Sequence, residues 1–223
     1  MIGSQRRCET LGLAAVLALL LSAAQAVGAA EDVWTGVERV VAVGDVHGDY
    51  ERFIAVLRFA GLIDANGNWS GGKTYLVQTG DALDRGPEPR KVIDLLMKLE
   101  DQARRAGGHV HALMGNHEAM NVYGDLRYVS PGGRSPTAKA EAGQPPGYAE
   151  YRRQFGPDGP YGRWIRGHNV VIRINDTVFL HGGIAPKYAG YTIREINNRV
   201  REELEDFSRL QGGIVGDTEG PLW

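Results

Sequence analysis

The stretch Gly80-Asp-Ala-Leu-Asp-Arg-Gly86 places two carboxylates and a guanidinium side by side, with a glycine at each end. The residues directly before it, 74–79, form an apolar run typical of a buried strand, and the segment from Pro89 onward is typical of a helix. The polar stretch therefore lies at the exit of a strand, where open α/β sheets place their ligand sites. Asp81 and Asp84 would repel each other there unless a cation or a hydrogen-bond donor compensates, although Asp-Arg-Gly taken alone is also ordinary turn chemistry.

Two further apolar runs end in polar stretches of the same kind. The run 39–43 leads into Gly44-Asp-Val-His-Gly48, and the run 109–114 leads into Gly115-Asn-His-Glu118. Helical patterns over 49–60 and 89–106 separate the three runs. Strand, polar stretch and helix recur in this order, which predicts an α/β fold whose polar stretches meet at the carboxyl ends of adjacent strands.

The second half of the chain is less regular. Residues 123–164 are rich in glycine and proline, so we expect an insertion at about 123–165 that lies over the site as a cap, the alternative being a surface loop. A β-hairpin is predicted at 169–180 with its turn at Asn175-Asp176, and it exits into His181-Gly-Gly183. A capping box from Thr192 to Glu195 predicts the last helix.

The first residues have the pattern of a secretory signal peptide. Two arginines, Arg6 and Arg7, precede an apolar run at 11–21, and Ala24-Gln-Ala26 or Val27-Gly-Ala29 offers a cleavage site. We therefore predict a signal peptide at 1–26, a periplasmic or secreted mature protein, and no stable membrane anchor after cleavage. The single cysteine, Cys8, lies in the part removed, so no disulfide is expected. A formal net charge of -2 and the absence of a basic stripe argue against nucleic-acid binding.

The polar residues at the predicted strand exits form a set with a common chemistry. Carboxylate, imidazole and amide groups together suit manganese, iron or zinc. Two such ions about 3.5–4 Å apart would generate hydroxide near neutral pH and clamp a phosphoryl oxygen. Arg85 would bind the phosphoryl group, and His117 would act as general acid with Asp84 fixing its tautomer. The five metal-ligand candidates are Asp45, His47, Asp81, Asn116 and His181.

The four polar motifs resemble the signature series of the calcineurin-like metallophosphoesterases, in particular the phosphoprotein phosphatase branch. The segment Asn121-Val-Tyr-Gly-Asp-Leu-Arg-Tyr128, the long insertion and the closing Gly220-Pro-Leu-Trp223 resemble the bacterial Shewanella-like protein phosphatases. The resemblance covers about 37–223 and implies a catalytic domain built as a β-sandwich flanked by helices. It also implies that Asp81 is shared by two metals, the first completed by Asp45 and His47 and the second by Asn116 and His181.

The chain departs from the family pattern at its end. The family has a further metal-ligand histidine beyond the Pro-Leu-Trp stretch and usually a second phosphate-binding arginine, but no histidine follows His181. We therefore expect a fragment that lacks part of the second sheet, or an incomplete metal centre. His109, His111 and His168 are interpreted as structural or surface residues.

The favoured function is hydrolysis of phosphomonoesters, on a phosphoprotein or a small phosphate ester, by in-line attack of a metal-bridged hydroxide. Two alternatives stay open at this point. One is a dinucleoside polyphosphate hydrolase, and the other is a phosphate-binding module without catalytic activity.

Overall fold

The computed structural model describes residues 31–134 and 143–223, and residues 31–223 form one compact unit. The predicted signal peptide and residues 135–142 of the predicted cap lie outside the described residues. Within the two described ranges, no helix is both long and apolar enough to cross a membrane.

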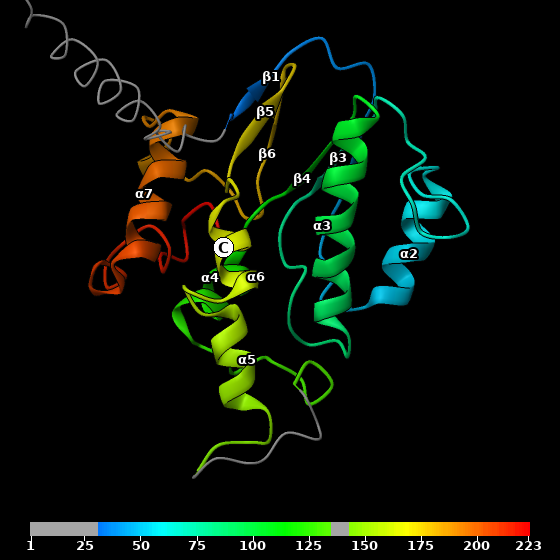
Figure 1. Cartoon of the computed structure of the whole chain (residues 1–223). Helices are drawn as coiled ribbons and strands as arrows, with labels where there is room; N and C mark the ends of the chain where they lie inside the picture. Colours follow the sequence, from blue (N-terminus) through cyan, green and yellow to red (C-terminus); the bar gives the residue numbers. More distant parts are fainter. Residues whose placement is uncertain (1–30, 135–142) are drawn as a thin grey trace, which may run out of the picture. The chain divides into compact units, whose positions relative to one another are not determined.

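The first sheet consists of three parallel strands, β2, β3 and β4, connected by helices α2 and α3 (Figure 1). Val41 pairs with Leu76, which pairs with Val110, so the three strands end at the same edge of the sheet. The predicted alternation of strands and helices is therefore confirmed. The bounds are β2 (Val40–Val43), α2 (Tyr50–Phe59), β3 (Tyr75–Gln78), α3 (Pro89–Arg105) and β4 (His109–Ala112).

The two connecting helices begin at recognisable start signals and bury one face each. The Asp49 carboxylate accepts the backbone N–H of Arg52 at 3.1 Å and so caps α2. α3 begins with Pro89, whose missing N–H would have no partner in the first helical turn. Each apolar side chain buried along these helices contributes about 1.5–3 kcal/mol. The largest of them are Phe53, Leu57, Ile93, Leu96 and Leu99.

The second sheet contains β1 (Val33–Trp34), β5 (Ile172–Ile174) and β6 (Thr177–Phe179). β5 and β6 form the predicted antiparallel hairpin, which turns at Asn175 with a φ of 53°. β1 pairs in parallel with β5. The sequence analysis missed β1, because two residues are too few to carry a periodic pattern.

A small apolar cluster joins the two sheets. Val77 of β3 and Leu113, which follows β4, pack with Ile172 and Ile174 of β5. Trp34 of β1 lies with its ring centroid 4.2 Å from that of His111 on β4. Two sheets packed through such a layer, with helices around them, confirm the expected α/β fold of the sandwich type.

Helices α5 (Tyr148–Phe155) and α6 (Pro160–Arg166) lie in the predicted insertion, to which the sequence analysis assigned no regular elements. The glycines and prolines that suggested loops instead mark the helix ends: Gly147 precedes α5, and Gly159 and Pro160 begin α6. Both helices are anchored by fully buried side chains, Tyr151 and Phe155 from α5 and Ile165 from α6. Whether the segment caps the site is still a prediction.

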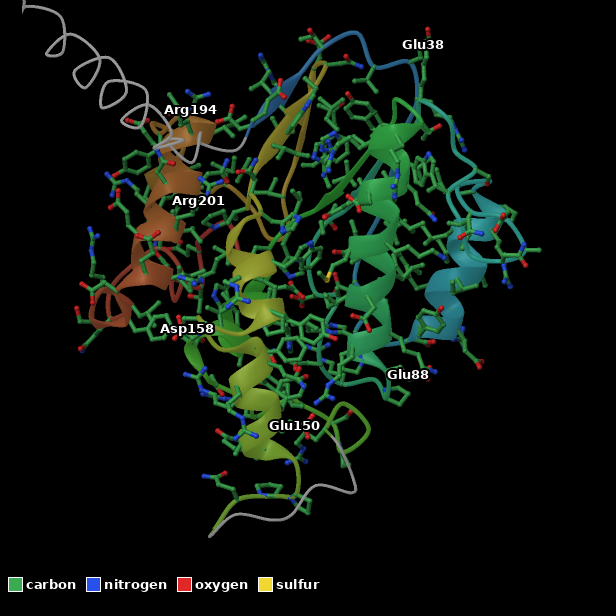
Figure 2. The ribbon with its side chains drawn as sticks, in the orientation of Figure 1. Glu38, Glu88, Glu150, Asp158, Arg194 and Arg201 are labelled. Atoms are coloured by element: carbon green, nitrogen blue, oxygen red, sulfur yellow. The ribbon has the colours of Figure 1, made fainter. Side chains whose placement is uncertain are left out.

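Helix α7 (Ile193–Glu205) begins at the predicted capping box. Thr192 Oγ1 accepts the Glu195 N–H at 3.2 Å, and Glu195 Oε2 accepts the Thr192 N–H at 2.7 Å. Two short 3-10 helices flank α7, η1 (Pro186–Tyr188) and η2 (Phe207–Arg209). Charged side chains lie at the outside of the ribbon, among them the exposed Glu38, Asp158 and Arg194 (Figure 2).

His111 is buried in the layer between the sheets and makes the fold sensitive to acid. Burial, and then the neighbouring His109 and His168, lower the pKa of His111 to about 3. The folded protein therefore keeps this imidazole neutral between pH 3 and pH 6.5, whereas the unfolded chain binds a proton there. Because the unfolded state binds more protons in this window, the stability supplied by neutral His111 is present above pH 6.5 and is lost as the pH falls.

A His111→Phe variant, which packs an aromatic ring against Trp34 without a titrating group, is expected to lose less stability on acidification. Between pH 7 and pH 5 the wild-type free energy of unfolding should fall by about 2 kcal/mol more than that of the variant. Urea denaturation at both pH values measures this difference. Equal pH dependence in the two proteins would contradict it.

Candidate active site

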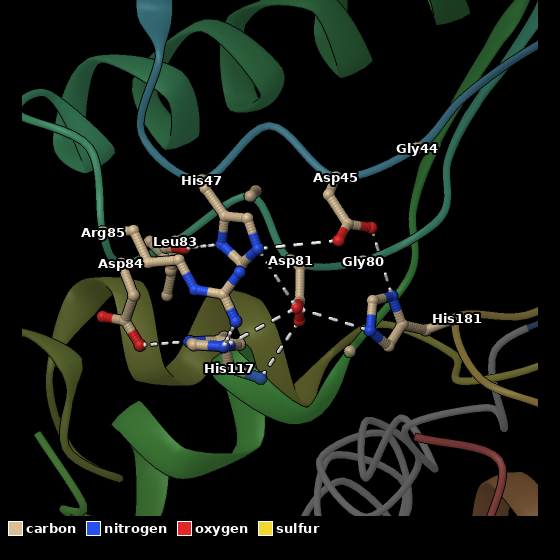
Figure 3. A network of polar contacts seen from close by, with 12 residues as sticks. Gly44, Asp45, His47, Gly80, Asp81, Leu83, Asp84, Arg85, His117 and His181 are labelled. Atoms are coloured by element: carbon tan, nitrogen blue, oxygen red, sulfur yellow. Dashed lines mark hydrogen bonds and ion pairs between the residues drawn. The ribbon is translucent and has the colours of Figure 1, made fainter. Parts of the chain in front are cut away.

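The predicted site residues come together at the edge where the parallel strands end (Figure 3). Asp45 and His47 follow β2, and residues 81–85 follow β3. Helix α4 (Asn116–Tyr123) begins directly with Asn116 and His117, and His181 follows β6. Four segments that are far apart in the sequence thus contribute to one cluster, as the sequence analysis expected.

Asp81 lies at the centre of this cluster and is almost fully buried. Its Oδ2 atom lies 3.7 Å from His47 Nε2, 3.8 Å from His117 Nε2 and 3.4 Å from His181 Nε2. Asp45 is exposed and lies at the rim, with Oδ2 at 3.5 Å from His47 Nε2 and Oδ1 at 3.8 Å from His181 Nδ1. One buried carboxylate therefore faces three imidazoles.

Hydrogen bonds to the backbone orient two of these imidazoles. His47 Nδ1 lies 2.9 Å from the Leu83 carbonyl, and His181 Nδ1 lies 3.2 Å from the Thr79 carbonyl. Since a carbonyl can only accept, each Nδ1 carries a proton, and Nε2 is the atom left to face the cluster and bind a cation there. His47 Nε2 is buried without a hydrogen-bond partner among the described residues.

One terminal atom of the Asn116 carboxamide points at Asp81 and His181. This atom lies 3.1 and 3.3 Å from the two Asp81 carboxylate oxygens and 3.2 Å from His181 Nε2. All three neighbours are acceptors. An amide NH2 in this position would donate to them, whereas an amide oxygen would need a cation among the four atoms.

The residues present fit a centre that holds divalent cations. Two groups have ligand atoms within 4.8 Å of one another, and both include Asp81. The unpartnered Nε2 atom of His47, the Nε2 atom of His181, carboxylates and an amide are the donor set that zinc, manganese and iron sites use, with second-sphere carbonyls that fix the imidazoles. The two groups are His47–Asp81–His117 and Asp45–Asp81–His181.

His117 differs from the other two histidines because its Nδ1 atom bonds to a carboxylate and not to a backbone carbonyl. Its Nδ1 atom lies 2.7 Å from Asp84 Oδ2, and its Nε2 atom lies 3.2 Å from Arg85 Nη2. Asp84 is fully buried, whereas Arg85 is exposed. The guanidinium can therefore reach an anion from solvent while it stays beside the imidazole.

Contacts between Asp81 and the histidines shift the pKa values of these groups toward their charged forms. Burial opposes the charge of Asp81, but the hydrogen bond and charge of His181, with the charge of His117, lower the pKa of Asp81. Burial likewise opposes protonation of His117 and His181. For His117, the hydrogen bond to Asp84 and the charge of Asp81 outweigh burial and raise its pKa. For His181, the hydrogen bond to Asp81 and the charge of the same carboxylate raise its pKa.

The loops that carry these residues have unusual backbone conformations. His47, Asp81, Asp84 and Arg85 have φ values of 47°, 56°, 67° and 60°. Residues other than glycine rarely adopt this left-handed region of the backbone, and such strain concentrates at functional sites. Gly115 completes the close packing, since a Cβ there would collide with the Asp81 carboxylate.

Glu118 holds the strained loop after β3 in place. This fully buried carboxylate accepts backbone N–H groups at both oxygens: Oε2 from Asp81 at 2.7 Å and Gly115 at 2.9 Å, and Oε1 from Ala82 at 2.9 Å and Leu83 at 3.1 Å. Burial raises the pKa of Glu118 to about 7, while the N–H donors favour the charged form. The sequence analysis gave Glu118 no role, because it predicted no helix at 116–123 whose buried face could have pointed to this carboxylate.

Replacement of Glu118 by glutamine is expected to destabilise the fold by about 2–3 kcal/mol. The glutamine amide oxygen would keep one pair of N–H donors, but its NH2 would face the other pair. Alanine would leave four buried donors unpaired and should cost more. Urea denaturation of both variants tests this order, with Glu205→Gln at the end of α7 as control. Equal stability of Glu118→Gln and the wild type would contradict the role of Glu118 in holding the loop after β3.

The fold and the site define a class of metallophosphoesterase. Residues 38–213 match the calcineurin-like phosphoesterase family, and the chain belongs to this family. A phosphoester hydrolase with a divalent metal centre is therefore the kind of protein that the family defines, and the expected family assignment is confirmed.

Within this family, the chain is similar to several proteins named as phosphatases. Shewanella-like protein phosphatase 2 of Arabidopsis thaliana is 34% identical over 76% of this chain and 52% of its own length. Shewanella-like protein phosphatase 1 of Plasmodium berghei is 32% identical over 85% of this chain and 52% of its own length. The crystal structure of the cold-active protein-tyrosine phosphatase of a psychrophilic Shewanella species matches with a TM-score of 0.73 and 34% identity, over 86% of this chain and 58% of that one. This chain thus spans about half the length of these relatives.

Proposed function

We propose that this protein hydrolyses phosphomonoesters. The observation that carries the proposal is the convergence at Asp81: ligand-type side chains from three other segments surround this buried carboxylate, and an acid pair with an arginine lies directly beside them. The names of the relatives as phosphatases support it over the alternatives of a polyphosphate hydrolase and of a binding module without activity.

The metal ligands in this proposal are the five residues expected from the sequence. When bound, manganese, iron or zinc ions would activate water as a nucleophile and neutralise the charge of the phosphoryl group. The fixed imidazoles of His47 and His181 and the shared carboxylate of Asp81 would hold them. Asp45 and Asn116 would complete the ligand set.

Three other side chains would handle the substrate. Arg85 would bind the phosphoryl oxygens from the solvent side, where its guanidinium is exposed. His117 would donate a proton from Nε2 to the leaving oxygen, and Asp84 would keep the other proton on Nδ1.

Metal content and turnover of p-nitrophenyl phosphate on the purified chain test the proposal. We expect about two metals per chain and hydrolysis that a chelator abolishes. Phosphopeptides and diadenosine tetraphosphate, supplied in parallel, separate a phosphomonoesterase from a polyphosphate hydrolase. Phosphate binding without turnover would favour the binding module instead.

The substrate in this proposal is a phosphorylated protein or a small phosphate ester. We further propose that the enzyme works outside the cytoplasm, an idea that the arginines and apolar run at the start of the sequence support. N-terminal sequencing of the protein recovered from an expression host would test it through the cleavage site.

A further inference from the structure

One buried polar residue of α4 lies behind the acid pair and has no role in the proposed function. Asn121 follows His117 by four residues, so it lies one turn further along the same face of the helix. Its side chain is fully buried. It begins the segment 121–128, which the sequence analysis singled out without assigning it a chemical role.

The side-chain NH2 of Asn121 is directed at Asp84. Its Nδ2 atom lies 3.1 Å from Asp84 Oδ1 and 3.0 Å from Asp84 Oδ2, and 2.8 Å from the His117 carbonyl oxygen. Asp84 Oδ2 in turn lies 2.7 Å from His117 Nδ1 (Figure 3). The order Asn121, Asp84, His117 is thus one continuous hydrogen-bonded chain.

Asp84 depends on this contact for its orientation. Among the described residues, only His117 and Asn121 donate to its carboxylate, although a carboxylate has about four acceptor sites. Its backbone is in the left-handed region, with a φ of 67°. A buried carboxylate with one donor fewer would be free to rotate about its side-chain bonds, and the imidazole bonded to it would move with it.

The unpaired carbonyl oxygen of the Asn121 side chain indicates that this residue does more than fill space in the core. Its Oδ1 atom is buried and has no hydrogen-bond partner among the described residues. An unpaired buried oxygen costs free energy, and an apolar side chain of the same shape would avoid that cost.

We propose that Asn121 is a positioning residue that fixes the Asp84 carboxylate and, through it, directs His117 Nε2 into the site. Asn121 touches neither the metal ligands nor the phosphoryl group. Its contribution to turnover rests on the proposed function, because His117 acts as general acid only there. The hydrogen-bonded geometry of His117 itself does not depend on that function.

The kinetic test uses the full metal-loaded chain with Asn121→Leu, which keeps the shape and removes the donor. We expect kcat to fall about 10- to 100-fold and KM to stay within about twofold, because a misplaced acid affects the transition state and not binding. Asn121→Ala serves as the second variant if leucine impairs folding. Asn197→Leu is the matched control, because Asn197 is also buried but bonds the backbone of Val170 and Val171. It should reduce stability without changing kcat per folded molecule.

A double-mutant cycle separates positioning from a general loss of structure. In an Asp84→Ala background, Asn121→Leu should have no further effect on kcat, because the carboxylate through which it acts is gone. Equal fold-losses in both backgrounds, an unchanged kcat in Asn121→Leu, or a loss confined to KM would each overturn the proposal.

A readout without turnover keeps the two proposals distinguishable. In zinc-loaded protein labelled with 15N-histidine, the Nδ1–H signal of His117, assigned with His117→Gln, should be present in the wild type. It should broaden or shift in Asn121→Leu as the bond to Asp84 loosens. An unchanged signal would overturn the positioning role, whereas a shifted signal in a wild-type protein that hydrolyses nothing would overturn only the phosphatase function.

Discussion

Replacement of Asp81 by asparagine is expected to remove metal binding and turnover together. Asp81 Oδ2 lies within 3.8 Å of three imidazole Nε2 atoms, so it is the one side chain shared by both candidate ligand groups. Asparagine keeps the shape but not the charge. A neutral amide would leave Asp45 as the one carboxylate among the five proposed ligands, and we expect the metal content to fall from about two to at most one per chain.

The loss of activity should be about a thousandfold or more, since metal ions contribute several kcal/mol to such reactions and each 1.4 kcal/mol is a factor of ten. Metal analysis and p-nitrophenyl phosphate kinetics measure both effects. The backbone N–H of residue 81 still bonds to Glu118, so circular dichroism should show a folded variant.

Thermal unfolding gives a third, independent measurement of the same replacement. Added Mn²⁺ should raise the Tm of the wild type, because a ligand that binds only the folded state stabilises it. The rise should be absent in Asp81→Asn and intact in Asp158→Asn, which changes an exposed carboxylate outside the cluster. Full metal content in Asp81→Asn would show that the cations bind elsewhere.

The site could be predicted from the sequence because its residues follow regular elements. Short runs rich in β-branched residues predict the strands, and the carboxyl ends of parallel strands share one edge. Asp45, Asp81 and His117 therefore had to lie close together once the strands were placed. His181 joined them because the hairpin that precedes it has a strong local turn signal at Asn175.

Features that depend on distant contacts could not be predicted in this way. The pairing of β1 with β5 joins residues such as Val33 and Arg173, and no local pattern encodes it. The clamp of Glu118 on the loop after β3 spans 35 to 37 residues for its contacts with that loop. Helices α5 and α6 were missed for another reason: glycine and proline serve both as loop residues and as helix caps, and only the packing of Tyr151 and Phe155 distinguishes the two uses.

Replacement of His117 by asparagine is expected to lower kcat without lowering metal content. General acid catalysis contributes about 10²–10⁴-fold, so a loss in this range is expected for substrates whose leaving oxygen needs a proton, such as phosphoserine peptides. The fall in kcat should be smaller for p-nitrophenyl phosphate, because nitrophenolate leaves readily as the anion. The dependence of the loss on the leaving group is the signature of a missing acid.

Metal analysis of the same variant decides between two readings of the geometry. His117 Nε2 lies 3.8 Å from Asp81 Oδ2, close enough for His117 to belong to a ligand group with His47 and Asp81. It also lies 3.2 Å from the Arg85 guanidinium, which opposes both a metal ion and a proton at the same atom, so geometry alone does not separate the two roles. If His117 is the acid, the metal content stays at about two per chain and the loss follows the leaving group. If it is a ligand, one metal is lost and all substrates slow by the same factor. Arg85→Leu sharpens the choice. Removal of the guanidinium would strengthen metal binding by the chain if His117 is a ligand, but would leave its metal content unchanged if His117 is the acid.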